Sequence, residues 1–241
     1  MASKIIVDQI EKTGGSLTAL TLPTSNASAS EFLQNDGAGA LSWASASAGF
    51  NSVQEFTSGG TWSRPTGVTK ILVFVTGGGA GGKYMSSDYG TGGGAAATAI
   101  KFIDVSAIPS VTVAIGAGGV GGDATNPYYS PAGGDSTFGV APATVHCTGG
   151  GGGITSGVNT PGPGGTATGG DLNVTGGGGT YGGGGTGQGG ASFWGSGTSL
   201  GYESNYVSPL ANNIYGAGGG GSRWNTAGSG GPGVCFVMEF K

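Results

Sequence analysis

Charged side chains are scarce in this sequence. It holds 8 lysine and arginine residues against 12 aspartate and glutamate residues, which gives a net charge of −4 at neutral pH. The basic residues are scattered along the sequence and form no cluster that could bind the phosphate groups of a nucleic acid, so no nucleic-acid partner is expected. Disorder by composition combines low hydrophobicity with a high net charge, whereas charged residues make up only 8% of this chain. We therefore expect an ordered protein.

Cysteine, histidine and long apolar runs are also rare. The cysteines Cys147 and Cys235 are compatible with a disulfide or with two free thiols. The single histidine, His146, precedes Cys147, and neighbours on a strand point to opposite faces, which argues against a catalytic pair. No two acids form a convincing carboxylate pair, so we expect no catalytic residue, no metal, no cofactor and no enzymatic activity. Without a signal peptide or an apolar run of about 18 residues, the chain is expected to fold in a cytosol.

Glycine is the residue that the sequence has in excess, at 59 of 241 positions. Collagen needs glycine at every third position, and runs such as "TGGGGGIT" break that period. The stretch "VTGGGGTYGGGGTGQGG" (174–190) has almost no side chains that could be buried. Glycine also loses more backbone freedom on ordering than any other residue, so another interaction must stabilise the stretch. We expect packed polyglycine II helices, whose outward N–H and C=O groups bond to neighbouring backbones. An interior helix of this kind is expected to admit no Cβ on any of its three faces.

The predicted fold class is all-β, in two parts. Residues 1–48 form a β-rich leader with strands in "KIIVDQIE", "SLTALTLP" and "FLQNDGAGALSWA", and this part is too short to fold unaided, so a threefold association is expected. Residues 49–241 form a head with a β-sandwich-like framework, at about 53–76, 110–116 and 233–241, which carries the polyglycine insertion. The segment "ILVFV" (71–75) is apolar on both faces, which is typical of a sheet covered on both sides.

Several stretches carry a resemblance to a known family. "VQEFTSGGTWSRPTGVTKILVFVTGGGAGG", "GAGGVGGDA" and "GGPGVCFVMEF" resemble the glycine-rich domain at the ends of bacteriophage tail fibre proteins. "ASKIIVDQIEKTGG" with "SLTALTLP" looks like the leader of tail fibre-like proteins of marine phages, and "FLQNDGAGALSWA" is similar to a strand repeat of fibre shafts. The resemblance implies a homotrimeric virion fibre, assembled in the host cytoplasm, with its leader on the particle through other tail or adaptor proteins. Its head would bind a host cell-surface glycan or outer-membrane protein.

Three glycine motifs mimic ligand sites without the required context. "GGGAGGKY" (77–84) follows a strand like a phosphate-binding loop, but Tyr84 replaces the Ser or Thr that would hold magnesium, and no helix follows. "GAGGVG" (116–121) fits a dinucleotide fingerprint without its crossover helix. "GGVGGD" matches one calcium-binding repeat but has no tandem copy, so Asp123 and Asp135 are interpreted as turn or loop residues.

The loops between the glycine tracts concentrate aromatic side chains with polar neighbours, as recognition surfaces do. The predicted receptor-binding residues are Tyr84, Tyr89, Tyr128, Tyr129, Phe193, Trp194, Tyr202, Tyr206, Tyr215 and Trp224. The alternative for each is that it seals the bundle or fills a subunit interface. Phe56, Trp62, Phe74 and Phe236 lie in strand patterns and are predicted to be core residues.

Two other functions compete with receptor binding. The chain is also compatible with a purely structural decoration of a virion tail or capsid, which would not bind isolated cells. An ice-binding polyglycine protein would need a flat, regular row of Thr or Ala, and the irregular bulky loops argue against it.

Overall fold

The computed structural model divides the chain into two compact units, Met1–Gly49 and Phe50–Lys241. It describes residues 9–10, 20–29, 31–36, 38, 40–45, 49–86, 90–125, 130–139, 144–153, 160–182, 186–198, 214–223 and 226–241. No α-helix or 3-10 helix occurs among these residues, and no helix of the described part is long and apolar enough to cross a membrane. The boundary between the two units lies one residue beyond the predicted end of the leader.

The N-terminal unit contains two short antiparallel strand pairs. β1 (Gln9–Ile10) pairs with β2 (Leu20–Thr21), and β3 (Glu31–Asn35) pairs with β4 (Leu41–Ser45). Phe32 and Leu33 of β3 are 49% and 43% exposed, because a two-stranded ribbon has no second layer to cover them. The described residues of this unit thus form no hydrophobic core of their own.

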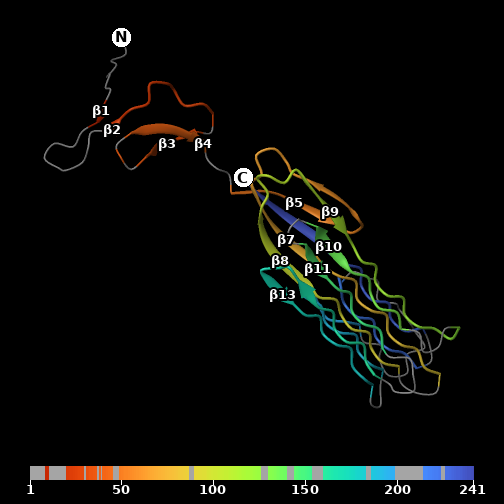
Figure 1. Cartoon of the computed structure of the whole chain (residues 1–241). Coiled ribbons are helices and arrows are strands. Elements are labelled where there is room, and N and C mark those ends of the chain that lie inside the picture. The colour runs from red at the N-terminus through yellow and green to blue at the C-terminus, as the bar shows by residue number, and fades with distance from the viewer. Residues whose placement is uncertain are drawn as a thin grey trace, which may run out of the picture. The chain divides into compact units, whose positions relative to one another are not determined.

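The second unit, the head, is built on two five-stranded antiparallel sheets (Figure 1). The first sheet has the order β13-β8-β7-β14-β5 and the second the order β12-β11-β10-β9-β6. The strands are β5 (Phe50–Phe56), β6 (Gly60–Ser63), β7 (Lys70–Thr76), β8 (Thr98–Asp104), β9 (Ser110–Ala114), β10 (Ser136–Gly139), β11 (Val145–Cys147), β12 (Ala167–Thr168), β13 (Leu172–Val174) and β14 (Val234–Phe240). The C-terminal strand β14 pairs with both β5 and β7, which confirms that these distant segments share one sheet.

The core lies between the two sheets, because each strand turns alternate apolar residues inward. Trp62 and Phe138 from one sheet pack there with Val73 and Val237 from the other, and all four are fully buried. One charged side chain, Glu239, is also buried; it accepts hydrogen bonds from Trp62 Nε1 at 2.8 Å, from Gln54 Nε2 at 2.6 Å and from Ser52 Oγ. These donors compensate for the loss of water around the carboxylate.

Beyond the sheets, the glycine-rich segments continue the strands as a bundle of polyglycine II helices. In segment 77–83, consecutive amide groups donate to three different neighbouring segments, and the next three repeat the same order. The donor–acceptor pairs are Gly78–Gly134, Gly79–Gly231, Ala80–Gly94, Gly81–Pro131, Gly82–Gly228 and Lys83–Thr91. A repeat of three residues per turn is the geometry of polyproline II, so the prediction from the glycine tracts is confirmed.

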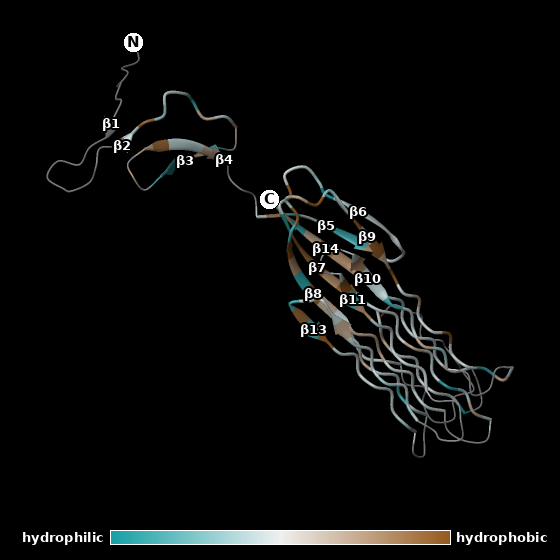
Figure 2. Cartoon of the chain, viewed as in Figure 1, coloured by the Kyte–Doolittle hydropathy of each residue, from teal (hydrophilic) through white to brown (hydrophobic). Residues whose placement is uncertain are grey.

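Segment 77–83 lies at the centre of this bundle. Its carbonyl groups accept from three further segments, through the amides of Gly150, Gly119 and Gly219. Segment 91–97 repeats the arrangement and donates to segments 175–181, 216–222 and 148–153. The bundle is therefore held by backbone hydrogen bonds, while the apolar side chains gather in the sheets (Figure 2).

Segments at the rim of the bundle expose every third residue. Thr175, Gly178 and Tyr181 follow this spacing in segment 175–181, where Thr180 is exposed as well, whereas segment 216–222 is buried throughout. The composition of the four-glycine run 176–179 suggested an interior helix. This interpretation is wrong, because the run lies in a rim segment. The expectation that interior helices admit no Cβ is also wrong in places, because Ala80 and Ala95–Ala97 are at most 1% exposed.

Candidate functional site

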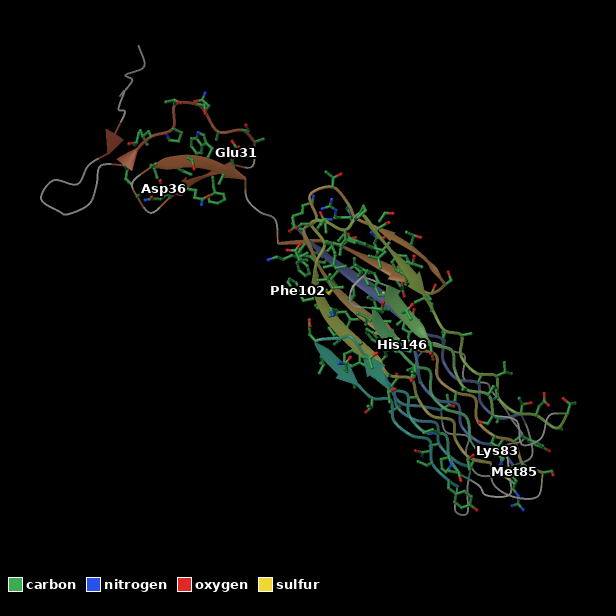
Figure 3. All side chains as sticks on the ribbon, viewed as in Figure 1. Glu31, Asp36, Lys83, Met85, Phe102 and His146 are labelled. Atoms are coloured by element: carbon green, nitrogen blue, oxygen red, sulfur yellow. The ribbon has the colours of Figure 1, made fainter. Side chains whose placement is uncertain are left out.

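The end of the bundle that lies farthest from the sheets gathers the turns between the glycine segments. Lys83 and Met85 mark this distal end in Figure 3. The Lys83 amide donates to Thr91 O at 2.9 Å, Ser222 N donates to Lys83 O, and Met85 N donates to Ser222 O. These bonds bring three segments that are far apart in sequence to the same end.

Other chain reversals of the head reach the same level. Gly122 N donates to Gly82 O, and Ala227 N donates to Gly122 O, which places both beside the Lys83 segment. Thr180 accepts from Gly92 N and donates to Gln188 O. Ser130 Oγ donates to Gly81 O and accepts from Gly153 N. The described residues next to positions 87–89, 126–129, 154–159, 183–185 and 224–225 therefore share one end of the bundle.

One predicted receptor-binding residue, Tyr84, lies at this distal end. It forms a parallel bridge with Ser222 and is only 8% exposed, so its side chain is largely covered by the described residues. Six further candidates lie outside the described residues, and their role stays a prediction. They are Tyr89, Tyr128, Tyr129, Tyr202, Tyr206 and Trp224.

The remaining three candidates lie at the sheet end of the bundle. Trp194 donates from Nε1 to Thr76 Oγ1 at 2.8 Å, and its ring centroid is 5.2 Å from Phe236 and 6.2 Å from Phe74. Phe193 packs edge-on against Trp194 at 5.0 Å. Phe74 and Phe236 therefore lie beneath an aromatic cover on the outer face of the sheet and not between the sheets, where a core role was predicted; Trp62 is in the core and Phe56 packs against it.

Tyr215 joins the same cluster and carries a perturbed ionisation. Its ring lies 6.1 Å from Phe236, and its hydroxyl donates to Glu55 Oε1 at 2.6 Å. The hydrogen bond to the Glu55 carboxylate raises the pKa of the Tyr215 hydroxyl, because ionisation would remove the donated proton. The geometry of Phe193, Trp194 and Tyr215 is that of packing residues, and their contact with a receptor stays a prediction.

Sequence reasoning missed one exposed aromatic at the distal end. Tyr181 follows Thr180 in segment 175–181 and is 47% exposed. It was overlooked because it interrupts a glycine run instead of belonging to a non-glycine loop. Its spacing of three residues from Gly178 is the signal that places it on the outer side of a rim helix.

The other polar groups singled out in the sequence have structural partners. Asp123 Oδ1 accepts from the amide and hydroxyl of Thr125, as in a turn. Asp135 accepts from Gly149 N, and its Oδ2 lies 2.9 Å from His146 Nε2. No group of three or more metal-ligating side chains occurs in the part of the chain that the structure describes.

The two cysteines are free and buried between the sheets. Cys147 Sγ donates to Val75 O at 3.0 Å, on the face opposite to that of His146. Burial raises the pKa of both thiols to about 12, because an ionised sulfur would lie in an apolar environment. Such thiols are poor nucleophiles at neutral pH.

The glycine motifs that mimic nucleotide sites are bundle segments. Residues 77–83 form the central helix, with their amides bonded to other backbones and not arranged around an open cradle. Residues 116–122 form a neighbouring helix, in which Gly119 N donates to Gly79 O.

A comparison with protein families agrees with this architecture. The profile of a family described as a glycine-rich domain matches residues 51–238, which is almost all of the head. A search of curated proteins finds no match. The chain therefore belongs to the glycine-rich domain family.

Proposed function

We propose that this chain is a phage tail fibre protein whose head binds a host cell surface through the distal end of the glycine bundle. The observation that carries the proposal is the gathering of chain reversals at one end of a hydrogen-bonded scaffold. A rigid scaffold allows the turns to vary without loss of the fold, and this is how binding surfaces are commonly built. The resemblance of the leader and the head to tail fibre proteins supports the same function.

The partners follow from this assignment. The N-terminal unit attaches to the virion through other tail or adaptor proteins and associates as a homotrimer, since its short strand pairs need additional surface to fold. The head meets a host glycan or outer-membrane protein. The protein is then localised to the virion, and its task is adhesion without chemistry.

The distal aromatic residues are the contacts to test. Tyr128 and Tyr129 belong to a predicted recognition loop that lies outside the described residues, and the exposed Tyr181 ends the rim segment 175–181. Aromatic side chains with a polar tip give large contact areas at a low cost in conformational entropy. Trp194 and Tyr215 are less suitable, because their rings are already engaged by the sheet.

The test is binding of fluorescently labelled full-length protein to a panel of marine bacteria. We expect saturable binding to some strains, and at least a tenfold loss of affinity for the triple variant Tyr128→Ala, Tyr129→Ala, Tyr181→Ala. Thr112→Ala, on the outer face of the β9 sheet, is the matched control and should bind like the unmodified protein. Equal binding by the triple variant would reject the distal end as the binding surface.

A purely structural virion decoration is the competing function. It predicts that the isolated protein binds none of the strains to which the corresponding virion adsorbs. Labelling of whole particles would then still detect the chain on the tail or capsid.

A further inference from the structure

The outer face of the sheet β13-β8-β7-β14-β5 is apolar, although much of it is exposed to solvent in a single chain. Two of its three inner strands carry Leu72 and Phe74 on β7 and Phe236 and Met238 on β14. Phe102 on β8 is 51% exposed and is labelled in Figure 3. The face thus has the composition of a buried surface.

Among the described residues of the head, a cover is seen over one end of this face. Trp194 and its aromatic neighbours cover the row that contains Phe74 and Phe236. The next rows towards the far end of the strands stay open. Their exposed members are Phe50 at 57%, Val53 at 48% and Phe102 at 51%, while Leu172, at the sheet edge of the row that contains Phe74 and Phe236, is also 53% exposed.

The second sheet provides an internal comparison. Its outward positions on β9 are Ser110, Thr112 and Ala114, and those on β10 and β11 include Thr137 and His146. A polar outer face of this kind is what an antiparallel sheet presents to water. The two outer faces of one sandwich therefore differ, and only the first has the residues of an interface.

We infer that this open apolar face is covered by the same face of other copies of this chain, which meet around a common symmetry axis. Four of the eight large apolar side chains that are exposed on the described part of the head lie on this face, so the best apolar match to it among these residues is the face itself. Lys70 and Asp104 pair across β7 and β8 at its margin, which supplies both signs of charge for contacts between copies.

The size of the face agrees with a contact that depends on the leader. An aromatic side chain buries about 150–250 Å² when it is fully covered. The half-exposed aromatic and aliphatic side chains of the face together therefore present roughly 400 Å² of apolar surface. This is roughly half of the ~800 Å² per partner in a stable interface. Tethering by an associated leader raises the effective concentration of the heads and makes such a contact sufficient.

The test measures the reactivity of cysteines introduced into the full-length chain. Val53→Cys and Phe102→Cys lie on the apolar face, and Thr112→Cys lies on the outer face of the second sheet as the control. The native thiols do not interfere at neutral pH because both are buried. Light scattering gives the mass of the same samples as a multiple of the 22.9 kDa chain.

We expect an oligomeric mass, with maleimide labelling of Val53→Cys and Phe102→Cys at least tenfold slower than labelling of Thr112→Cys. Equal labelling rates at the three positions in a folded oligomer would overturn the inference. Slow labelling in a monomer would also overturn it, because another part of the same chain would then cover the face. Cell binding is not part of this measurement, so its outcome is independent of the receptor hypothesis.

Discussion

Trp194 links the glycine insertion to the β framework through one side chain. Its indole lies across Phe74 and Phe236 and donates a hydrogen bond to Thr76. The residue was selected from the sequence as a receptor contact, since aromatic residues in loops serve recognition and packing alike. Residue 194 is far from residues 74 and 236 in the sequence, so its contact with them in the sheet could not be predicted.

Replacing Trp194 by Ala is therefore expected to destabilise the head. We predict a loss of about 2 kcal/mol or more, which lowers the melting temperature by roughly 4–8 °C. Trp194→Phe keeps the ring contacts and removes the bond to Thr76, so it should cost only about 1 kcal/mol. Calorimetry of both variants is the measurement; an unchanged melting temperature for Trp194→Ala would show that the cluster contributes nothing to stability.

Cys147 and Cys235 make stability depend on pH in the alkaline range. Burial raises their pKa from 9.0 to about 12, so the unfolded chain releases these protons at lower pH than the folded chain. The resulting stabilisation is complete below about pH 9 and is lost as the pH rises towards 12. Denaturant unfolding from pH 8 to pH 11 should show a steeper decline than in the variant Cys147→Ala, Cys235→Ala; parallel curves would contradict the burial of the thiols.

At the scale of the elements, interior and rim helices of the bundle differ in what they tolerate. A methyl group on Gly79 of the central segment would overlap the backbone carbonyl of Ala217. At Gly178, on the rim, the nearest atom would be Gly162 O at 3.5 Å, which is ordinary contact. The same substitution is therefore expected to have opposite effects in the two helices.

Gly79→Ala should cost about 3 kcal/mol or more, because it forces the helices apart and leaves backbone groups unpaired. That corresponds to a melting temperature lower by roughly 6–12 °C. Gly178→Ala should be neutral or stabilise by up to about 1 kcal/mol, through the reduced entropy of the unfolded chain. If both variants melted at the same temperature, the assignment of interior and rim segments would be wrong.

The elements themselves were largely predictable from the sequence. Strand patterns in 53–76 and 233–241 predicted a common sheet or sandwich, which the structure shows to be one sheet, and the glycine tracts excluded α-helix and predicted polyglycine II. Glycine content did not reveal which tracts are interior, because a run such as 176–179 is equally rich in glycine at the rim. The apolar faces of β7 indicated a sheet covered on both sides, and the described residues supply part of that cover.

At the scale of the whole molecule, we expect the leader and the head to have separate tasks. The leader has exposed apolar strands without a core, and the head has a core and a bundle but an open apolar face. The proposed association of the leader would account for both features, since it would provide the missing layer and bring the heads together.

Deleting residues 1–49 should leave a folded head that is monomeric or weakly associated at micromolar concentration. The head keeps its own core and its backbone bonds, so its melting temperature should change little. Analytical ultracentrifugation of the deletion and the full chain is the measurement. A deletion variant that remains a stable trimer would mean that the head contains the principal interface.

The bundle of hydrogen-bonded polyglycine helices is the scaffold for the proposed distal binding surface. Amide hydrogen exchange tests the existence of this bundle most directly. Each amide from Gly78 to Lys83 donates to a neighbouring backbone, so these amides should exchange as slowly as those of β7 and β14. The amide of Gly79, bonded to Gly231 O at 2.8 Å inside the bundle, should be among the slowest. Exchange of residues 78–83 at the rate of an unstructured chain, while β7 and β14 stay protected, would contradict the bundle and with it the rigid support for a distal binding surface.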